Sequence, residues 1–200
     1  TITSNYGMRY HPILKVNKLH TGIDIGAPSG AKIVAADSGT VIFSGWLGAY
    51  GNAVIIETDL TLLEENILSK INQLGLSNEI YTSSYLNCPA YSQSELEDAT
   101  TNDALYILYG HLKSKPDFKI GDEVKQGQFI GNVGNTGFSG NSHLHLEIRI
   151  GPPNATFNSL AHYDNSVSSQ EMKNYCLWRV SNLFSLFDPL LLFEPQPTKP

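Results

Sequence analysis

Five residues in three short segments of this chain combine imidazole and carboxylate groups in a pattern typical of a metal site. His20 and Asp24 lie four residues apart, His143 and His145 form a His-x-His pair, and His111 stands in Tyr-Gly-His-Leu. Imidazoles together with a carboxylate suit Zn²⁺ or another divalent transition metal. A set of three protein ligands leaves one coordination position open for water, which is typical of a catalytic rather than a structural metal.

The His-x-His pair belongs to a segment that predicts a β-strand. Residues 144–150, like residues 53–57, are rich in strand formers. Because alternate side chains of a strand share a face, His143, His145 and Glu147 are expected on one face. One histidine can then be a ligand while the other lies beside the metal-bound water. The opposite face is expected to join the core, with Leu144, Leu146, Ile148 and Ile150.

The segment that holds His20 and Asp24 predicts a loop or a short extended stretch. No apolar helical period surrounds it, and glycine and proline punctuate it. The site therefore differs from the helical His-Glu-x-x-His motif of other zinc proteases. His11 and His162 have no neighbouring residue of ligand type at a useful spacing, so we interpret them as surface or structural histidines.

Short sequence motifs follow one another in a defined order along most of the chain. The chain resembles the lysostaphin-type (LytM-like) zinc metallopeptidases, which are peptidoglycan endopeptidases of bacteria and their phages. The motifs that carry this resemblance are, in chain order, Ile2–Ile13, His20–Ile25, Gly39–Val41, Gly51–Ile56, Tyr109–Leu112, Gly121–Val124, Gly127–Gly131, Gly134–Gly137 and His143–Glu147.

The resemblance implies a role for each of the five residues. His20, Asp24 and His145 would bind one Zn²⁺, and His111 and His143 would be catalytic. The implied reaction is hydrolysis of an amide in a peptidoglycan cross-link peptide by a zinc-bound water. One catalytic histidine would take a proton from the water and pass it to the leaving amine, and the other would stabilise the oxyanion. The sequence does not assign these two roles between them.

Two points near the site stay open at this stage. Glu147 could orient a ligating imidazole, or it could simply pair with an arginine. Gly140-Asn141 stands where the family often has Thr-Gly, in a loop expected to border the cleft, so this departure bears on substrate preference.

Other functions also fit parts of the pattern. One is a wall-binding or regulatory relative that keeps the metal without catalysis. Another is an iron enzyme with two histidines and one carboxylate. That class typically has His-x-Asp rather than the His-x-x-x-Asp of this chain. A carrier module of the biotinyl type would need an exposed lysine at a hairpin tip and no cluster of histidines.

The expected fold is mainly β, with an antiparallel sheet or barrel-sandwich core in a single domain over residues 1–200. Two connections are longer than ordinary loops, which predicts insertions at about 59–103 and about 151–186. Helical spacing of apolar residues indicates a helix early in the first insertion and late in the second. We expect these insertions to pack as decoration, to wall the cleft, or to dock a regulatory partner. Their two cysteines, Cys88 and Cys176, could form a disulfide or remain thiols.

Composition narrows the partners and the location. The chain has 200 residues, of which 41% are hydrophobic and 16% charged, so it can form one sizeable core. A net charge of −6 gives no electrostatic case for binding nucleic acid. No apolar run approaches the roughly 18 residues of a membrane span. The resemblance implies an extracytoplasmic protein, and any targeting segment would lie upstream of Thr1, which shows no signal-peptide pattern.

Overall fold

The structure is a computed structural model that describes residues 1–10, 15–60, 104–153 and 184–192. In these residues almost all regular structure is β, with two 3₁₀ turns, η1 (Gly48–Tyr50) and η3 (Pro189–Leu191). The prediction of a mainly β, antiparallel fold is confirmed. No helix of the described residues is long and apolar enough to cross a membrane.

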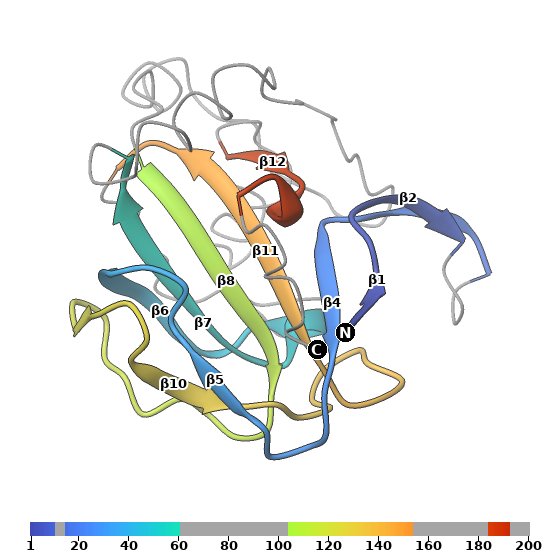
Figure 1. Ribbon diagram of the computed structural model, residues 1–200, viewed down its shortest axis with the longest axis horizontal. Helices are drawn as coiled ribbons and strands as arrows, with labels where there is room; N and C mark the ends of the chain where they lie inside the picture. Colours follow the sequence, from blue (N-terminus) through green and yellow to red (C-terminus); the bar gives the residue numbers. More distant parts are fainter. Residues whose placement is uncertain (11–14, 61–103, 154–183, 193–200) are drawn as a thin grey trace, which may run out of the picture.

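One large antiparallel sheet forms the body of the described structure (Figure 1). Strand β11 lies between β8 on one side and β4 on the other. Strand β12 pairs with the last part of β11, beyond the stretch that β4 covers. The strands, in spatial order, are β1 (Ile2–Ser4), β4 (Gly22–Gly26), β11 (His143–Gly151), β8 (Ala104–Leu112), β7 (Asn52–Asp59), β6 (Gly39–Trp46) and β9 (Glu123–Val124), with β12 (Ser185–Phe187) on β11.

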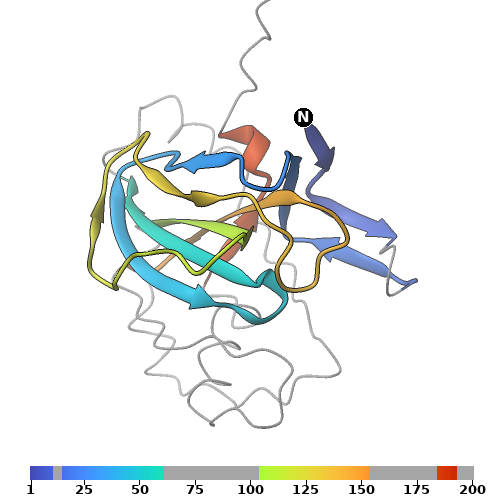
Figure 2. The same ribbon diagram turned by 90° about the horizontal axis from the view of Figure 1, so that it is seen from below.

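The centre of this sheet is buried on both faces, as the long apolar runs of β7 and β8 require. All nine residues of β8 are buried. One face packs with a second, two-stranded sheet of β5 (Lys32–Val34) and β10 (Phe129–Asn132). Figure 2 shows this pair opposite β7 and β8. The other face carries a smaller apolar cluster that includes Phe43, Leu108 and Phe184.

The two faces of β11 differ as the sequence predicts. Leu146, Ile148 and Ile150 join the main core. His145, Glu147 and Arg149 point to the opposite face and are also buried. This buried polar stripe runs from the middle of the sheet to the end of β11 where the predicted site residues lie.

A two-stranded hairpin of β2 (Gly7–Tyr10) and β3 (Asn17–His20) projects from the body beside β1 and β4 (Figure 1). The hairpin ends at His20, and β4 begins two residues later. One predicted site residue therefore comes from a projecting element and the others from the large sheet.

Several predictions fall on residues outside the described part. This group includes most of both insertions, their helices, Cys88, Cys176, His11 and His162. At the borders of the first insertion, β7 and β8 pair antiparallel with Asp59 opposite Ala104. The insertions and the disulfide stay predictions.

Candidate metal centre and catalytic residues

Three predicted ligands converge at one end of β11. Asp24 on β4 stands directly opposite His145 on β11, so the two form a cross-strand pair. Side chains of such pairs lie close together on one face. His20 joins them from the end of β3. The extended conformation predicted for this segment is confirmed by β3 and β4.

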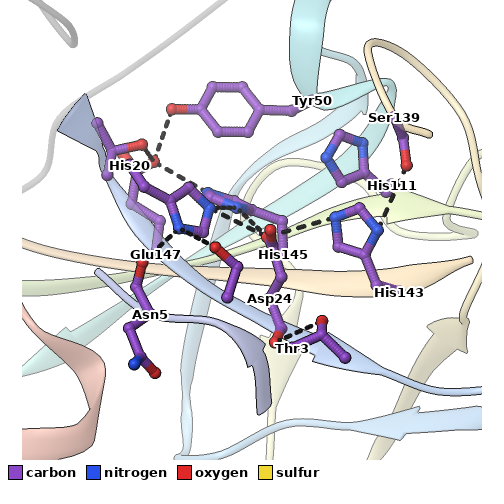
Figure 3. A network of polar contacts seen from close by, with 12 residues as sticks. Thr3, Asn5, His20, Asp24, Tyr50, His111, Ser139, His143, His145 and Glu147 are labelled. Carbon is purple, nitrogen blue, oxygen red and sulfur yellow. Dashed lines mark hydrogen bonds and ion pairs between the residues drawn. The ribbon is translucent and has the colours of Figure 1, made fainter. Parts of the chain in front are cut away.

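The ligand atoms form a small, nearly equilateral triangle (Figure 3). Asp24 Oδ1 lies 3.1 Å from both His20 Nε2 and His145 Nδ1, and these two nitrogens are 3.2 Å apart. Tetrahedral coordination at roughly 2.0–2.1 Å places ligand atoms about 3.3 Å from one another. The three atoms therefore fit a zinc-sized tetrahedral ion with one position left open.

The hydrogen-bond partner of the outer nitrogen of each imidazole indicates which ring nitrogen carries the proton. His20 Nδ1 lies 2.8 Å from the carbonyl oxygen of Asn5, which can only accept a hydrogen bond. His145 Nε2 lies 3.3 Å from Glu147 Oε2. When these outer nitrogens carry the protons, His20 Nε2 and His145 Nδ1 direct lone pairs at each other and at a carboxylate. Lone pairs at such separations repel one another unless a cation or a proton lies between them, so the donor set fits a metal ion.

Glu147 lies at the centre of the buried polar stripe, between His145 and Arg149. It is fully buried, and its Oε2 accepts hydrogen bonds from Thr21 Oγ1 at 2.5 Å and Tyr50 Oη at 2.6 Å. Its Oε1 accepts from Arg149 Nε at 2.6 Å. Glu147 thus contacts both a predicted ligand and an arginine, and its role in orienting that ligand stays a prediction.

His111 occupies an unusual backbone conformation at the end of β8. Its φ of 58° lies in the left-handed region, which few residues other than glycine adopt. Such strain is concentrated at functional sites. The ring Nδ1 donates to the carbonyl oxygen of Thr136 at 2.7 Å, so in the neutral ring Nε2 keeps its lone pair. The His111 ring lies 4.7 Å from the His143 ring and 5.9 Å from the His145 ring, centre to centre.

His143 lies at the start of β11, on the edge of the triangle. Its Nδ1 donates to the carbonyl oxygen of Asn141 at 2.8 Å, and its Nε2 lies 3.3 Å from Asp24 Oδ1. Both rings are thus anchored through Nδ1 on a backbone carbonyl, and Nε2 of each ring is not used in that contact.

Burial and the neighbouring groups shift the ionisation of the cluster. Burial opposes the charge of Asp24, but hydrogen bonds from His143, His145 and His20 outweigh it and hold the pKa of Asp24 well below its ordinary value. Burial also disfavours the imidazolium of His145, yet hydrogen bonds to Asp24 and Glu147 raise the pKa of His145. Burial, assisted by His145, lowers the pKa of His111 to about 3. His111 is therefore neutral near pH 7.

A cleft of about 390 Å³ opens over these residues. Arg9 and Lys18 of the hairpin line one part of it, and Tyr50 lines another. The segment 138–143 also borders it, as expected for the loop that holds Gly140-Asn141. All five predicted site residues face this cleft.

Sequence reasoning missed part of this arrangement. It gave no role to Thr21 or Tyr50, which hold Glu147, or to Thr136, which holds His111. It also overlooked Arg9, whose Nη2 lies 3.4 Å from Asp24 Oδ2. The signal for Tyr50 is weak, since it is one tyrosine in a short Gly-rich turn.

A sheet with this topology and this cluster of three histidines around a carboxylate define a metallopeptidase of the lysostaphin type. The profile of peptidase family M23 matches residues 18–68 and 97–158, more than half of the chain, and the chain belongs to that family. The resemblance seen in the sequence is thereby confirmed.

Individual relatives agree with the family. DD-carboxypeptidase/endopeptidase Mpg of Neisseria meningitidis serogroup B (strain ATCC BAA-335 / MC58) is 34% identical over 149 residues, which cover 74% of this chain and 24% of that protein. Lysostaphin of Staphylococcus simulans is 29% identical over 143 residues, 71% of this chain and 20% of that protein. The chain thus spans about a quarter of the length of the curated relatives it matches.

A solved structure of the antimicrobial peptidase lysostaphin from Staphylococcus simulans is similar in fold. The TM-score is 0.51 at 21% identity, and the alignment covers 100% of this chain and 55% of that one. At this identity the likeness supports the fold alone.

Proposed function

We propose that this chain is the catalytic unit of a zinc endopeptidase that hydrolyses amide bonds in the cross-link peptides of peptidoglycan. The observation that carries the proposal is the convergence of Asp24 Oδ1, His20 Nε2 and His145 Nδ1 beside two further imidazoles in one cleft. Relatives named as a DD-carboxypeptidase/endopeptidase and as a peptidoglycan DD-endopeptidase support the substrate class. Such a substrate lies in the cell envelope, so we infer an extracytoplasmic location.

His20, Asp24 and His145 are the residues that would hold the ion. A zinc ion there supplies Lewis-acid chemistry, because it polarises the scissile carbonyl and lowers the pKa of a bound water to about 7. Two nitrogen donors and one carboxylate oxygen suit zinc better than magnesium or calcium, which prefer oxygen ligands.

The two remaining histidines divide the proton transfers between them. His111 is neutral, and its Nδ1–H is held by the carbonyl of Thr136, so its Nε2 can accept a proton from the attacking water. The same nitrogen can then return this proton to the leaving amine. His143 has Nδ1 anchored on Asn141 in the same way, so a proton on its Nε2, beside Asp24, would provide a donor to the oxyanion that develops on the carbonyl oxygen. His111 and His143 in this arrangement favour catalysis over a role in metal retention alone.

Removal and return of the metal test this function. Treatment with a chelator should abolish release of free amines from purified peptidoglycan, and one equivalent of zinc should restore it. Full activity in the metal-free protein would contradict the proposal, as would a zinc-loaded protein that binds the wall without cleaving it.

A further inference from the structure

One short loop, residues 136–141, holds both proposed catalytic histidines by their outer ring nitrogens. The carbonyl oxygen of Thr136 accepts a hydrogen bond from His111 Nδ1 at 2.7 Å, and that of Asn141 accepts one from His143 Nδ1 at 2.8 Å. A backbone acceptor is only as well placed as the chain that carries it. The orientation of the two rings therefore depends on what fixes this anchoring loop.

The hydroxyl of Thr136 attaches the anchoring loop to strands β7 and β8. Its Oγ1 accepts a hydrogen bond from the backbone N–H of Asn52 at 3.0 Å and donates one to the carbonyl oxygen of Leu112 at 2.7 Å. Asn52 and Leu112 are partners across the two strands, and the pairing shifts register between Asn52 and Val54. Since a hydroxyl can donate and accept at once, this side chain joins the two strands where β8 ends.

The space around this hydroxyl is narrow. A Cβ atom at Gly51 would stand 2.4 Å from Thr136 Oγ1, and one at Gly137 would stand 2.3 Å from the backbone nitrogen of Gly51. A methyl group in place of the hydroxyl is larger and can neither donate nor accept a hydrogen bond. It would remove this partner from Asn52 and Leu112 and press on the neighbouring backbone, so the loop would have to move.

His111, which comes directly before Leu112, is the residue that needs this support. Its left-handed backbone, with a φ of 58°, persists only where the surroundings over-determine it. Its carbonyl oxygen accepts from the N–H of Gly134 at 3.0 Å, and its ring donates to the carbonyl of Thr136. The next carbonyl, that of Leu112, accepts from the Thr136 hydroxyl. Two residues of one segment thus hold His111 and its neighbour at three points.

We propose that the Thr136 hydroxyl is a positioning group that fixes the anchoring loop on β7 and β8 and so keeps Nε2 of His111 directed into the cleft. This rests on the proposed function, in which that nitrogen accepts the proton. Thr136 itself does not line the cleft. Its loss should therefore slow the chemical step through a misplaced base, while zinc and substrate still bind.

Three variants separate positioning from stability. Thr136→Val removes the hydroxyl, and Thr136→Ser keeps it. Thr58→Val is the matched control, because Thr58 is buried on the same strand β7 and its Oγ1 donates to the carbonyl of Ser38 at 2.9 Å, away from the cleft. Zinc content, kcat and KM on a cross-link peptide are measured for each variant. Nuclear magnetic resonance of zinc-loaded, ¹⁵N-histidine-labelled protein follows solvent exchange of the His111 Nδ1–H, which is assigned by its absence in His111→Asn.

The expected result is a loss confined to the hydroxyl-free variant. Thr136→Val should bind one equivalent of zinc and keep KM within about twofold, but its kcat should fall roughly tenfold or more. Exchange of its His111 Nδ1–H should be at least roughly tenfold faster than in wild type. Thr136→Ser should stay within about threefold of wild type and Thr58→Val within about twofold, and both should keep slow exchange.

Several results would overturn this role of Thr136. They are equal exchange of the Nδ1–H in Thr136→Val and wild type, an equal fall of kcat in Thr58→Val, and a Thr136→Ser variant as impaired as Thr136→Val. A loss of kcat that follows zinc content would do the same. If Thr136→Val does not fold, Thr136→Ala takes its place, since it removes the hydroxyl without adding bulk.

The exchange measurement needs no turnover, so it separates this inference from the proposed function. If the wild type cleaves no peptide, the proposed function fails. Faster exchange of the His111 Nδ1–H in Thr136→Val alone would still support positioning by the hydroxyl. Rapid exchange already in the wild type would reject it.

Discussion

His145 uses its two ring nitrogens for different tasks. Nδ1 faces Asp24 and His20, and Nε2 donates to the buried carboxylate of Glu147. A carboxylate behind a ligating imidazole fixes the tautomer and the ring orientation. Arg149 balances the charge of Glu147, so this carboxylate can stay ionised in the sheet interior. Zinc affinity is therefore expected to depend on a residue that does not touch the ion.

Glu147→Gln tests that dependence. The amide keeps the size of the side chain, but its NH₂ group is a hydrogen-bond donor. It would face other donors at a place where the carboxylate oxygen accepted hydrogen bonds. We expect zinc affinity to fall roughly 10- to 100-fold, measured by competition with a chromogenic chelator. Glu123→Gln is the matched control, because Glu123 is exposed and accepts a hydrogen bond from Thr40. Equal affinity in both variants would show that Glu147 has only a structural role.

His111→Asn separates the proposed base from the metal ligands. Asparagine tolerates the left-handed backbone that His111 adopts, so the strand end should keep its shape. The variant should bind one equivalent of zinc and lose activity by a factor of roughly 100 or more. Zinc content and turnover are measured on the same preparation. Unchanged turnover would remove His111 from the mechanism.

The depressed pKa of His111 also makes a prediction about stability. Because the folded state holds this pKa at about 3, against roughly 6.5 when unfolded, only the unfolded chain takes up the proton as pH falls below 6.5. The contribution of His111 is thus present above pH 6.5 and is lost toward pH 3. Between pH 7 and pH 5 the metal-free wild type should lose about 2 kcal/mol more unfolding free energy than His111→Asn. Denaturant titrations in chelator measure this difference, and parallel pH dependences would refute it.

At the scale of elements, the site depends on the close approach of β4 to β11. Gly22 lies opposite Glu147, and a Cβ atom at Gly22 would stand 2.2 Å from the carbonyl oxygen of Leu146. Only glycine allows this approach, which in turn brings Asp24 opposite His145. This close packing of the two strands explains why the residue between the predicted ligands His20 and Asp24 is a glycine.

Gly22→Ala should damage both the fold and the site. The added methyl group forces β4 away from β11, at a cost of roughly 1–3 kcal/mol or more. Zinc affinity should fall together with the stability. Gly140→Ala is the control, because nothing lies within 4 Å of a Cβ there, and its unfolding free energy should change by less than about 0.5 kcal/mol. Thermal unfolding with and without zinc measures both effects, and equal stability of the two variants would contradict this account of the strand pair.

The sequence could predict the local features of the site but not its long-range contacts. The alternation of a strand is enough to place His143, His145 and Glu147 on one face of β11. The sequence does not predict the hydrogen-bond partners of Glu147, because Thr21 is 126 residues away and Tyr50 is 97 residues away. Nothing local in the sequence encodes such pairings, which depend on strand order and register. The sequence could not predict the left-handed φ of His111 either, since histidine has no strong preference for that conformation.

At the scale of the whole molecule, the described sheet accounts for the site, and the predicted insertions remain to be placed. Residues 59–103 and 151–186 fall almost entirely outside the described part, as do Cys88 and Cys176. The M23 match leaves out residues 69–96, which lie within the first predicted insertion. A regulatory partner at the insertions and a disulfide between the cysteines therefore stay predictions.

We propose that the triangle of His20, Asp24 and His145 supports cleavage of wall cross-links. The most direct measurement is mass spectrometry of purified sacculi after digestion with the zinc-loaded protein, with His145→Ala as control. We expect cross-linked muropeptides to be converted to uncross-linked ones by the wild type alone, and the masses of the products will identify the bond. No conversion by the wild type, or equal conversion by His145→Ala, would contradict the claim.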